Sequence, residues 1–105
     1  MTRKIVIRPK ASEDLDEQFA YIAEDNIDAA LRFFDATRET ISQLAKMPGI
    51  GSPVQNSSLA GLRKLAVKGF NNHLIFYLTQ DNCIEVVRIL HAARDIPAIL
   101  DSEVT

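Results

Sequence analysis

The sequence contains one cysteine, no tryptophan, and only four glycines and four prolines. A single thiol, Cys83, cannot form an internal disulfide, which excludes the small disulfide-stapled secreted domains and is typical of a reducing cytoplasm. Long apolar runs are also missing. The opening stretch, MTRKIVIRPK, holds three consecutive apolar residues, too few for a signal peptide or a membrane span. We therefore expect a cytoplasmic protein that does not enter a membrane.

What is present is ordinary globular composition, with 47% apolar and 25% charged residues in a chain of 105. This length suits one domain, residues 1–105, with one core. The net charge is −2 and is unevenly spread: residues 1–10 carry four basic and no acidic residues, whereas residues 11–46 carry nine acidic and three basic ones. Because phosphate-binding proteins usually present a basic surface, this balance weighs against broad nucleic-acid binding, and we expect no direct sequence-specific nucleic-acid binding.

Two amphipathic helices are predicted in the first half of the chain, at about 12–25 and 28–46, because apolar residues recur there at helical spacing. Ser12 precedes an acidic first turn and is predicted to cap the first helix. Asn26 or Asp28 is available to cap the second. So short a break between the helices predicts an antiparallel helical hairpin.

The rest of the fold is predicted to be a small sheet. The predicted strands lie at 3–8, 62–67, 72–79 and 83–91, the last three joined by short, turn-rich connections. The stretch at 47–61 is predicted to be a loop, and a short helix is predicted at about 96–101. The expected class is α+β, in the order β-α-α-β-β-β(-α), with a small antiparallel sheet and the N-terminal helical hairpin packed on one face. The last helix would cover part of the other face.

A group of basic side chains lies on or beside the predicted strands: Arg8, Arg63, Lys64, Lys68, Arg88, His91 and Arg94. Taken together, they indicate a partly open, positively lined sheet surface that awaits a partner. Individually, each has an ordinary structural interpretation as well. Arg88 would pair with an acid of the helical hairpin, and Arg94 would solvate the last turn.

Other site chemistry finds little support in the sequence. His73 and His91 could approach each other across the last hairpin, but a third metal ligand is not evident, so no metal is expected. Gly-rich phosphate-binding spacing is missing, and the serine pair at 57–58 has no His–Asp partnership. We expect no cofactor.

Two segments resemble the ParE/RelE superfamily of bacterial toxins: LRKLAVKGFNNHLIFYL (62–78) and IEVVRILHAARDIPAIL (84–100). The second is similar to the ParE branch, in which an apolar strand runs into LH and an ARD turn before the last helix. The helix after RPKASEDL fits the same pattern, so the resemblance covers almost the whole chain. It implies a single toxin domain of a type II toxin–antitoxin, or plasmid-stabilisation, module that a cognate antitoxin holds silent.

The superfamily has two activities, and the resemblance implies one of them. The ParE branch is associated with inhibition of DNA gyrase, and the RelE branch cuts mRNA on the ribosome. The RelE branch uses a Tyr or a His–Tyr pair near the C-terminus, whereas DIPAILDSEVT after Arg94 contains no Tyr, His or Lys. This difference favours a non-enzymatic gyrase inhibitor. If the protein is an endoribonuclease instead, its expected catalytic residues are His91, Arg94, Arg63 and Lys64.

Contact residues follow from the same interpretation. The residues expected to contact the target are Arg88, His91 and Arg94. An apolar, partly covered sheet face would bind the antitoxin, and the residues expected there are Leu74, Phe76, Lys68 and Arg63. A third alternative is a non-toxic module that only binds another protein.

Overall fold

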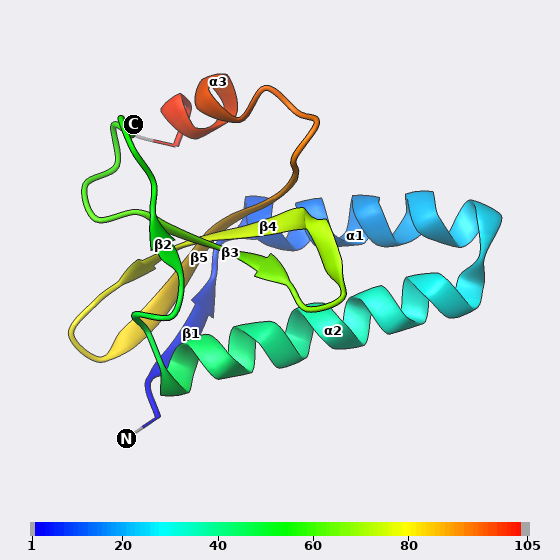
Figure 1. The fold of residues 1–105 in the computed structure, drawn as a ribbon, viewed down its shortest axis with the longest axis horizontal. Helices are drawn as coiled ribbons and strands as arrows, with labels where there is room; N and C mark the ends of the chain where they lie inside the picture. Colours follow the sequence, from blue (N-terminus) through cyan, green and yellow to red (C-terminus); the bar gives the residue numbers. More distant parts are fainter. Residues whose placement is uncertain (1, 104–105) are drawn as a thin grey trace.

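The computed structural model describes residues 2–103. Within them the chain forms one five-stranded mixed sheet, a long helical hairpin and a short last helix (Figure 1). The elements, in chain order, are β1 (Lys4–Ile7), α1 (Pro9–Asp25), α2 (Ile27–Lys46), β2 (Ser52–Pro53), β3 (Arg63–Val67), β4 (Phe70–Thr79), β5 (Cys83–His91) and α3 (Ile96–Asp101). The α+β class and the predicted element order are confirmed. None of the helices in the described part of the chain has the length and hydropathy needed to cross a membrane.

Helices α1 and α2 form the predicted antiparallel hairpin, which extends well beyond the sheet (Figure 1). Helix α1 begins at Pro9, with Arg8 in the N-cap position and no side-chain cap, so the prediction that Ser12 caps it is wrong. Proline suits the first helical position because the N–H it lacks would have no helical partner there. The cap of α2 is Asn26, one of the two candidates offered by the sequence, and its Oδ1 accepts the N–H of Ala29 at 3.0 Å.

The sheet has the strand order β1-β5-β4-β3-β2. Strands β3, β4 and β5 form the predicted antiparallel meander. Strand β1 pairs with β5 in parallel, so the sheet is mixed, which corrects the expectation of a purely antiparallel sheet. Short connections imply antiparallel neighbours, but β1 reaches β5 only through the rest of the fold, and its direction is therefore not fixed by a turn.

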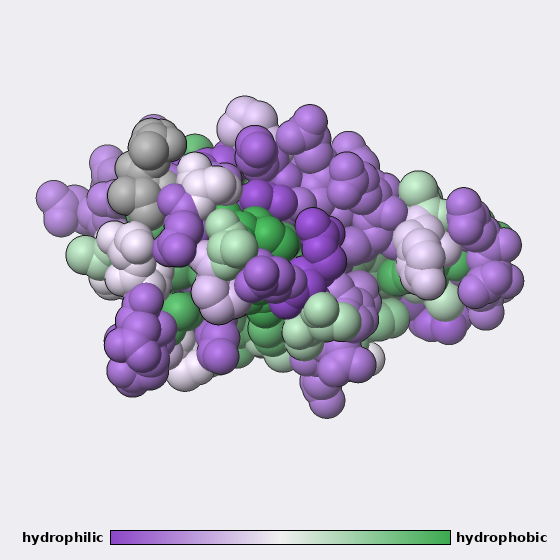
Figure 2. Space-filling model, turned by 90° about the horizontal axis from the view of Figure 1, so that it is seen from above, coloured by the Kyte–Doolittle hydropathy of each residue, from purple (hydrophilic) through white to green (hydrophobic). Residues whose placement is uncertain are grey.

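Apolar side chains cover both faces of the sheet. Between the sheet and the helical hairpin, Phe33 and Leu44 pack on Ile75 and Ile84. On the opposite face a second cluster lies under α3: Leu62, Phe76, Val87, Leu90 and Leu100. Covering on both faces explains why residues 74–78 of β4 are all apolar and why β5 is mostly apolar. Seen from the α3 side, the surface is mostly hydrophilic, with apolar residues in limited patches (Figure 2).

The predicted loop before β3 contains β2, a two-residue strand that pairs with β3. Tyr77 of β4 anchors this segment: its hydroxyl accepts the N–H of Gly51 at 2.9 Å and donates to the carbonyl of Pro48 at 2.8 Å. Burial raises the pKa of Tyr77, which keeps the hydroxyl protonated as a donor. A Cβ at Gly51 would lie 2.5 Å from the Tyr77 hydroxyl oxygen, so this close approach requires glycine.

Candidate functional site

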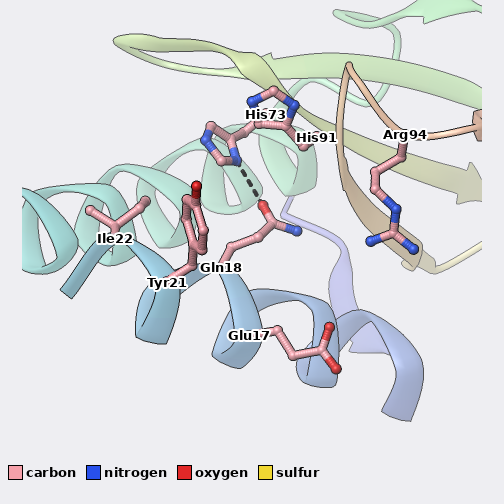
Figure 3. Close-up of a pocket in the computed structure, with 7 residues that line it drawn as sticks. All are labelled: Glu17, Gln18, Tyr21, Ile22, His73, His91 and Arg94. Atoms are coloured by element: carbon pink, nitrogen blue, oxygen red, sulfur yellow. Dashed lines mark hydrogen bonds between the residues drawn. The ribbon is translucent and has the colours of Figure 1, made fainter. Parts of the chain in front are cut away.

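A cavity of about 420 Å³ lies between α1 and the paired ends of β4 and β5 (Figure 3). Its lining residues are Glu17, Gln18, Tyr21, Ile22, His73, His91 and Arg94. Four of them come from two turns of α1, where residues four apart lie on one side of the helix. The two histidines come from the strands. Figure 3 places Arg94 across the view from Tyr21 and Ile22, on the segment that follows β5.

The register of the last hairpin puts His73 directly opposite His91. Their ring centroids are 5.0 Å apart, in an edge-to-face arrangement with an interplanar angle of 88°. His73 also packs against Phe33, with 4.6 Å between the ring centroids. The approach of the two histidines that the sequence suggested is therefore confirmed. Among the described residues, no group of three or more His, Cys, Asp or Glu side chains is arranged to hold a metal ion.

Gln18 holds His73 in one orientation. The amide nitrogen of Gln18 donates to the carbonyl of Ile89 at 2.7 Å, which leaves the amide oxygen to accept from Nδ1 of His73, also at 2.7 Å. Nδ1 of His73 therefore carries the proton and Nε2 is the free acceptor. Burial, and then the neighbouring His91, lower the pKa of His73, which favours this neutral form.

The tautomer of His91 is the opposite one. Its Nδ1 accepts the backbone N–H of Ala93 at 3.0 Å, so the ring proton lies on Nε2. The cavity thus contains one imidazole with a free acceptor and one with a free donor. This arrangement suits hydrogen bonding to a polar group that both accepts and donates.

Of the three residues expected to contact a target, the structure brings two together. His91 and Arg94 both line the cavity, and Arg94 is exposed. Arg88 does not, because its guanidinium makes two hydrogen bonds to the Asp14 carboxylate, at 2.7 and 2.8 Å. Its side chain is 11% exposed. The expectation that Arg88 faces a target is therefore corrected, and its alternative role as the partner of an acid in the helical hairpin is confirmed.

The residues expected to bind the antitoxin do not form one surface. Phe76 is 1% exposed and lies in the cluster under α3, because α3 and the loop before β3 cover the face that was expected to be open. Leu74 is half-buried against the same cluster. Arg63 donates to the carbonyl of Gly51, which ties it to the loop. Lys68 is exposed in the β3–β4 turn.

The four residues of the ribonuclease alternative also separate into two places. His91 lies opposite His73, near the start of β4, and Arg94 lines the same cavity. Arg63 lies opposite Tyr77, toward the other end of β4. Lys64 follows Arg63 on β3. The set therefore does not converge on one substrate-sized site.

The sequence analysis did not identify Asp14 and Gln18 of α1 as residues that position the site. Asp14 and Gln18 interrupt the apolar stripe of α1 at a spacing of four residues, a pattern that marks polar side chains aimed at the protein interior. That signal was available. Their partners Arg88, Ile89 and His73 lie far along the chain and no local pattern identifies them.

Comparisons with known proteins agree with this fold. Residues 5–96 match the model of the family described as "ParE toxin of type II toxin-antitoxin system, parDE". The chain is 29% identical over 92 residues to Toxin ParE1 of Caulobacter vibrioides, covering 87% of this chain and 91% of that one.

A solved structure described as "Chromosomal ParDE TA system from P. aeruginosa" superposes with a TM-score of 0.69. It covers 86% of this chain and 96% of that one, at 20% identity, and so supports the fold. Because the family model spans most of the sequence, from β1 to the start of α3, the match does not depend on one motif. The chain belongs to the ParE toxin family of type II toxin–antitoxin systems.

Proposed function

We propose that this ParE-family toxin inhibits DNA gyrase, and so replication, by binding it rather than by catalysis. Its setting in this proposal is a plasmid-stabilisation module in the cytoplasm, where a cognate antitoxin neutralises it. One observation favours action by contact rather than by catalysis: the four residues expected to be catalytic in a ribonuclease lie in two separate places. Arg63 donates to the carbonyl of Gly51 in the loop and lies away from His91. Metal-free RNA cleavage needs its acid, base and cations at one phosphate.

The target-binding surface in this proposal is the rim of the α1–β4–β5 cavity. Arg94 and His91 contribute a cation and a polar ring, and Tyr21 of α1, which lines the same cavity, is 76% exposed. Arginine and tyrosine are the residue types that most often dominate protein–protein binding energy. Lys68 and Leu74 remain in the proposal as antitoxin contacts. Phe76 would contribute only if α3 moved away from it.

A direct experiment is inhibition of purified gyrase in a DNA supercoiling assay, together with expression in bacteria. The proposal expects loss of supercoiling, filamentous cells and gyrase-linked DNA breaks, all suppressed by the cognate antitoxin. Unaffected gyrase together with arrested translation and cleaved mRNA would refute it. If the protein binds the product of the neighbouring gene but does not arrest growth, it would instead be a non-toxic interaction module.

The endoribonuclease alternative retains one observation in its favour, the His73–His91 pair in a cavity that also contains Arg94. The free Nε2 acceptor of His73 could serve as the base that RNA cleavage requires, with the Nε2–H of His91 as a hydrogen-bond donor beside it. This alternative predicts that either His73→Asn or His91→Gln abolishes mRNA cleavage in a ribosome-containing translation reaction. If cells expressing both variants still filament, the histidines are not catalytic.

A further inference from the structure

The cavity between α1 and the paired ends of β4 and β5 has the size of a small-molecule site. Its volume of about 420 Å³ lies within the range of about 300–1,000 Å³ that is usual for such sites. Within residues 2–103, Nε2 of His73 and Nε2 of His91 have no hydrogen-bond partner. The first of these atoms is an acceptor and the second is a donor.

Both Nε2 atoms are open to the cavity. Among residues 2–103, every buried side-chain nitrogen and oxygen atom has a hydrogen-bond partner. Since neither Nε2 has one, both atoms are accessible to solvent, and both histidines line the cavity. A ligand is thus offered one donor and one acceptor, from rings whose centroids are 5.0 Å apart.

Aromatic rings surround these polar atoms. Tyr21 lines the cavity and is 76% exposed, so its ring is free to stack on a planar group. Phe33 packs against His73 from the core, which together with the Gln18 hydrogen bond fixes that imidazole. Stacking on exposed aromatic rings, combined with hydrogen bonds to a base edge, is how proteins recognise unstacked nucleobases.

The charged residues of the lining are Arg94 and Glu17, which lie on the same side of the view in Figure 3, away from Tyr21. Arg94 is exposed and forms no ion pair with any residue of 2–103. A single cation suits a single phosphate group, whereas nucleic acids and polyphosphates require several. A carboxylate such as Glu17 is a common acceptor for ribose hydroxyls.

We propose that this cavity binds a nucleoside monophosphate. The base stacks on Tyr21 and presents its edge to His73 and His91, the phosphate binds Arg94, and the ribose hydroxyls face Glu17. A nucleobase edge fits the two imidazoles because it carries a donor beside an acceptor, as the N6 amine and N7 of adenine do. The inference does not depend on gyrase being the target.

A side-chain amide of a protein partner is the competing occupant. It offers the same donor and acceptor to His73 and His91. However, an amide supplies no anion for Arg94, and it is much smaller than a ligand that fills a cavity of about 420 Å³. The combined size, aromatic lining and charge therefore favour the nucleotide.

An NMR titration of the ¹⁵N-labelled protein with AMP tests the proposal. We expect saturable binding with a Kd below about 1 mM, and shifts of the imidazole ¹⁵N resonances of His73 and His91. Adenosine, which lacks the phosphate, and ribose 5-phosphate, which lacks the base, should each bind at least about tenfold more weakly. Ribose 5-phosphate or acetamide binding as tightly as AMP would overturn the proposal, and so would the lack of saturation by AMP.

Variants at two exposed positions separate the base from the phosphate. Tyr21→Ala should weaken the binding of AMP and of adenosine by about tenfold each. Arg94→Ala should weaken the binding of AMP by about tenfold and leave that of adenosine unchanged. Arg32→Ala, on α2 outside the lining, is the matched control. Wild-type affinity for AMP in either cavity variant contradicts the proposed pose. Because the titration contains no gyrase, its failure leaves the proposed function untouched.

Discussion

Asp14 of α1 and Arg88 of β5 form a two-point ion pair, with hydrogen bonds of 2.7 and 2.8 Å, and their side chains are 7% and 11% exposed. The same carboxylate accepts the N–H of Ile89 at 3.0 Å, just beyond the point where β1 stops pairing with β5. Beyond the end of β1, the Asp14 carboxylate thus accepts a β5 backbone N–H that a longer β1 strand would otherwise have paired. The hydrogen bonds that Arg88 donates to the Asp14 carboxylate raise the pKa of Arg88, so the guanidinium stays charged.

Removing this carboxylate should destabilise the fold strongly. Asp14→Ala leaves a buried guanidinium without its main partner and the N–H of Ile89 without an acceptor, at an expected cost of about 3–5 kcal/mol in the free energy of unfolding. Asp14→Asn keeps one acceptor and should cost less. Urea denaturation measures both, with exposed Asp16→Ala as the control, expected to stay within about 0.5 kcal/mol of wild type. A loss below about 1 kcal/mol in Asp14→Ala would contradict this role.

Two glycines of one loop should respond differently to alanine. At Gly51 a Cβ would lie 2.5 Å from the Tyr77 hydroxyl oxygen and 2.6 Å from the carbonyl oxygen of Lys64, so Gly51→Ala should cost about 1–3 kcal/mol. At Gly49 a Cβ meets nothing within 4 Å, and Gly49→Ala should change stability by less than about 1 kcal/mol. Thermal unfolding of the two variants provides the comparison. Equal melting temperatures would show that the loop shifts to accommodate a Cβ at position 51, and would contradict the requirement for glycine there.

His73 should make stability depend on pH. Its pKa is lower in the folded state than the ordinary value near 6.5, because the ring is buried beside His91. The unfolded chain therefore binds this proton first, and stability is lost as the pH falls through about 6.5 toward the folded value. His73→Asn should reduce the slope of unfolding free energy between pH 7 and 5 by up to about 1.4 kcal/mol per pH unit. Parallel curves for wild type and variant would exclude this contribution.

Below that range, Glu85 should act in the same direction. The hydrogen bond from Arg8 lowers the pKa of Glu85 from its usual 4.5, so the folded state favours the ionised form. Stability from this pair is complete above about 4.5 and is lost as the pH falls through the folded value. Because both side chains are about one-quarter exposed, the effect should be below about 1 kcal/mol. Glu85→Gln should flatten the acid end of the stability curve and leave the range above pH 6 unchanged.

Arg94 should matter for toxicity without mattering for the fold. Arg94 is exposed at the cavity rim, and if gyrase is the target, as proposed, Arg94→Ala should weaken gyrase inhibition by about tenfold, the loss typical of an interface arginine that contributes about 1–2 kcal/mol. His91→Gln should remain toxic, since a contact residue can be replaced by another polar side chain of similar shape. The control is Arg32→Ala, an exposed arginine on α2 outside the cavity lining. Full inhibition by Arg94→Ala in a supercoiling assay would remove this residue from the target surface.

The sequence by itself determined the elements with local signals. Periodicity defined both helices of the hairpin, and the short connections fixed β3, β4 and β5 as an antiparallel meander. The same register brought His73 opposite His91, as the pattern suggested. The cap of α2 could be narrowed to Asn26 or Asp28 because capping depends on residues within one turn, and the structure selects Asn26. These features could be predicted because each depends on neighbours in the chain.

Only the tertiary structure decided the features that join distant segments. The Asp14–Arg88 pair spans 74 residues, and the Gln18–His73 hydrogen bond spans 55. Both depend on the docking of α1 against the edge of β5, and so does the change of Arg88 from a presumed target contact to an internal partner. The parallel pairing of β1 and the burial of Phe76 under α3 arose in the same way. Burial and ion pairing depend on which surfaces meet in space, and no local periodicity encodes that choice.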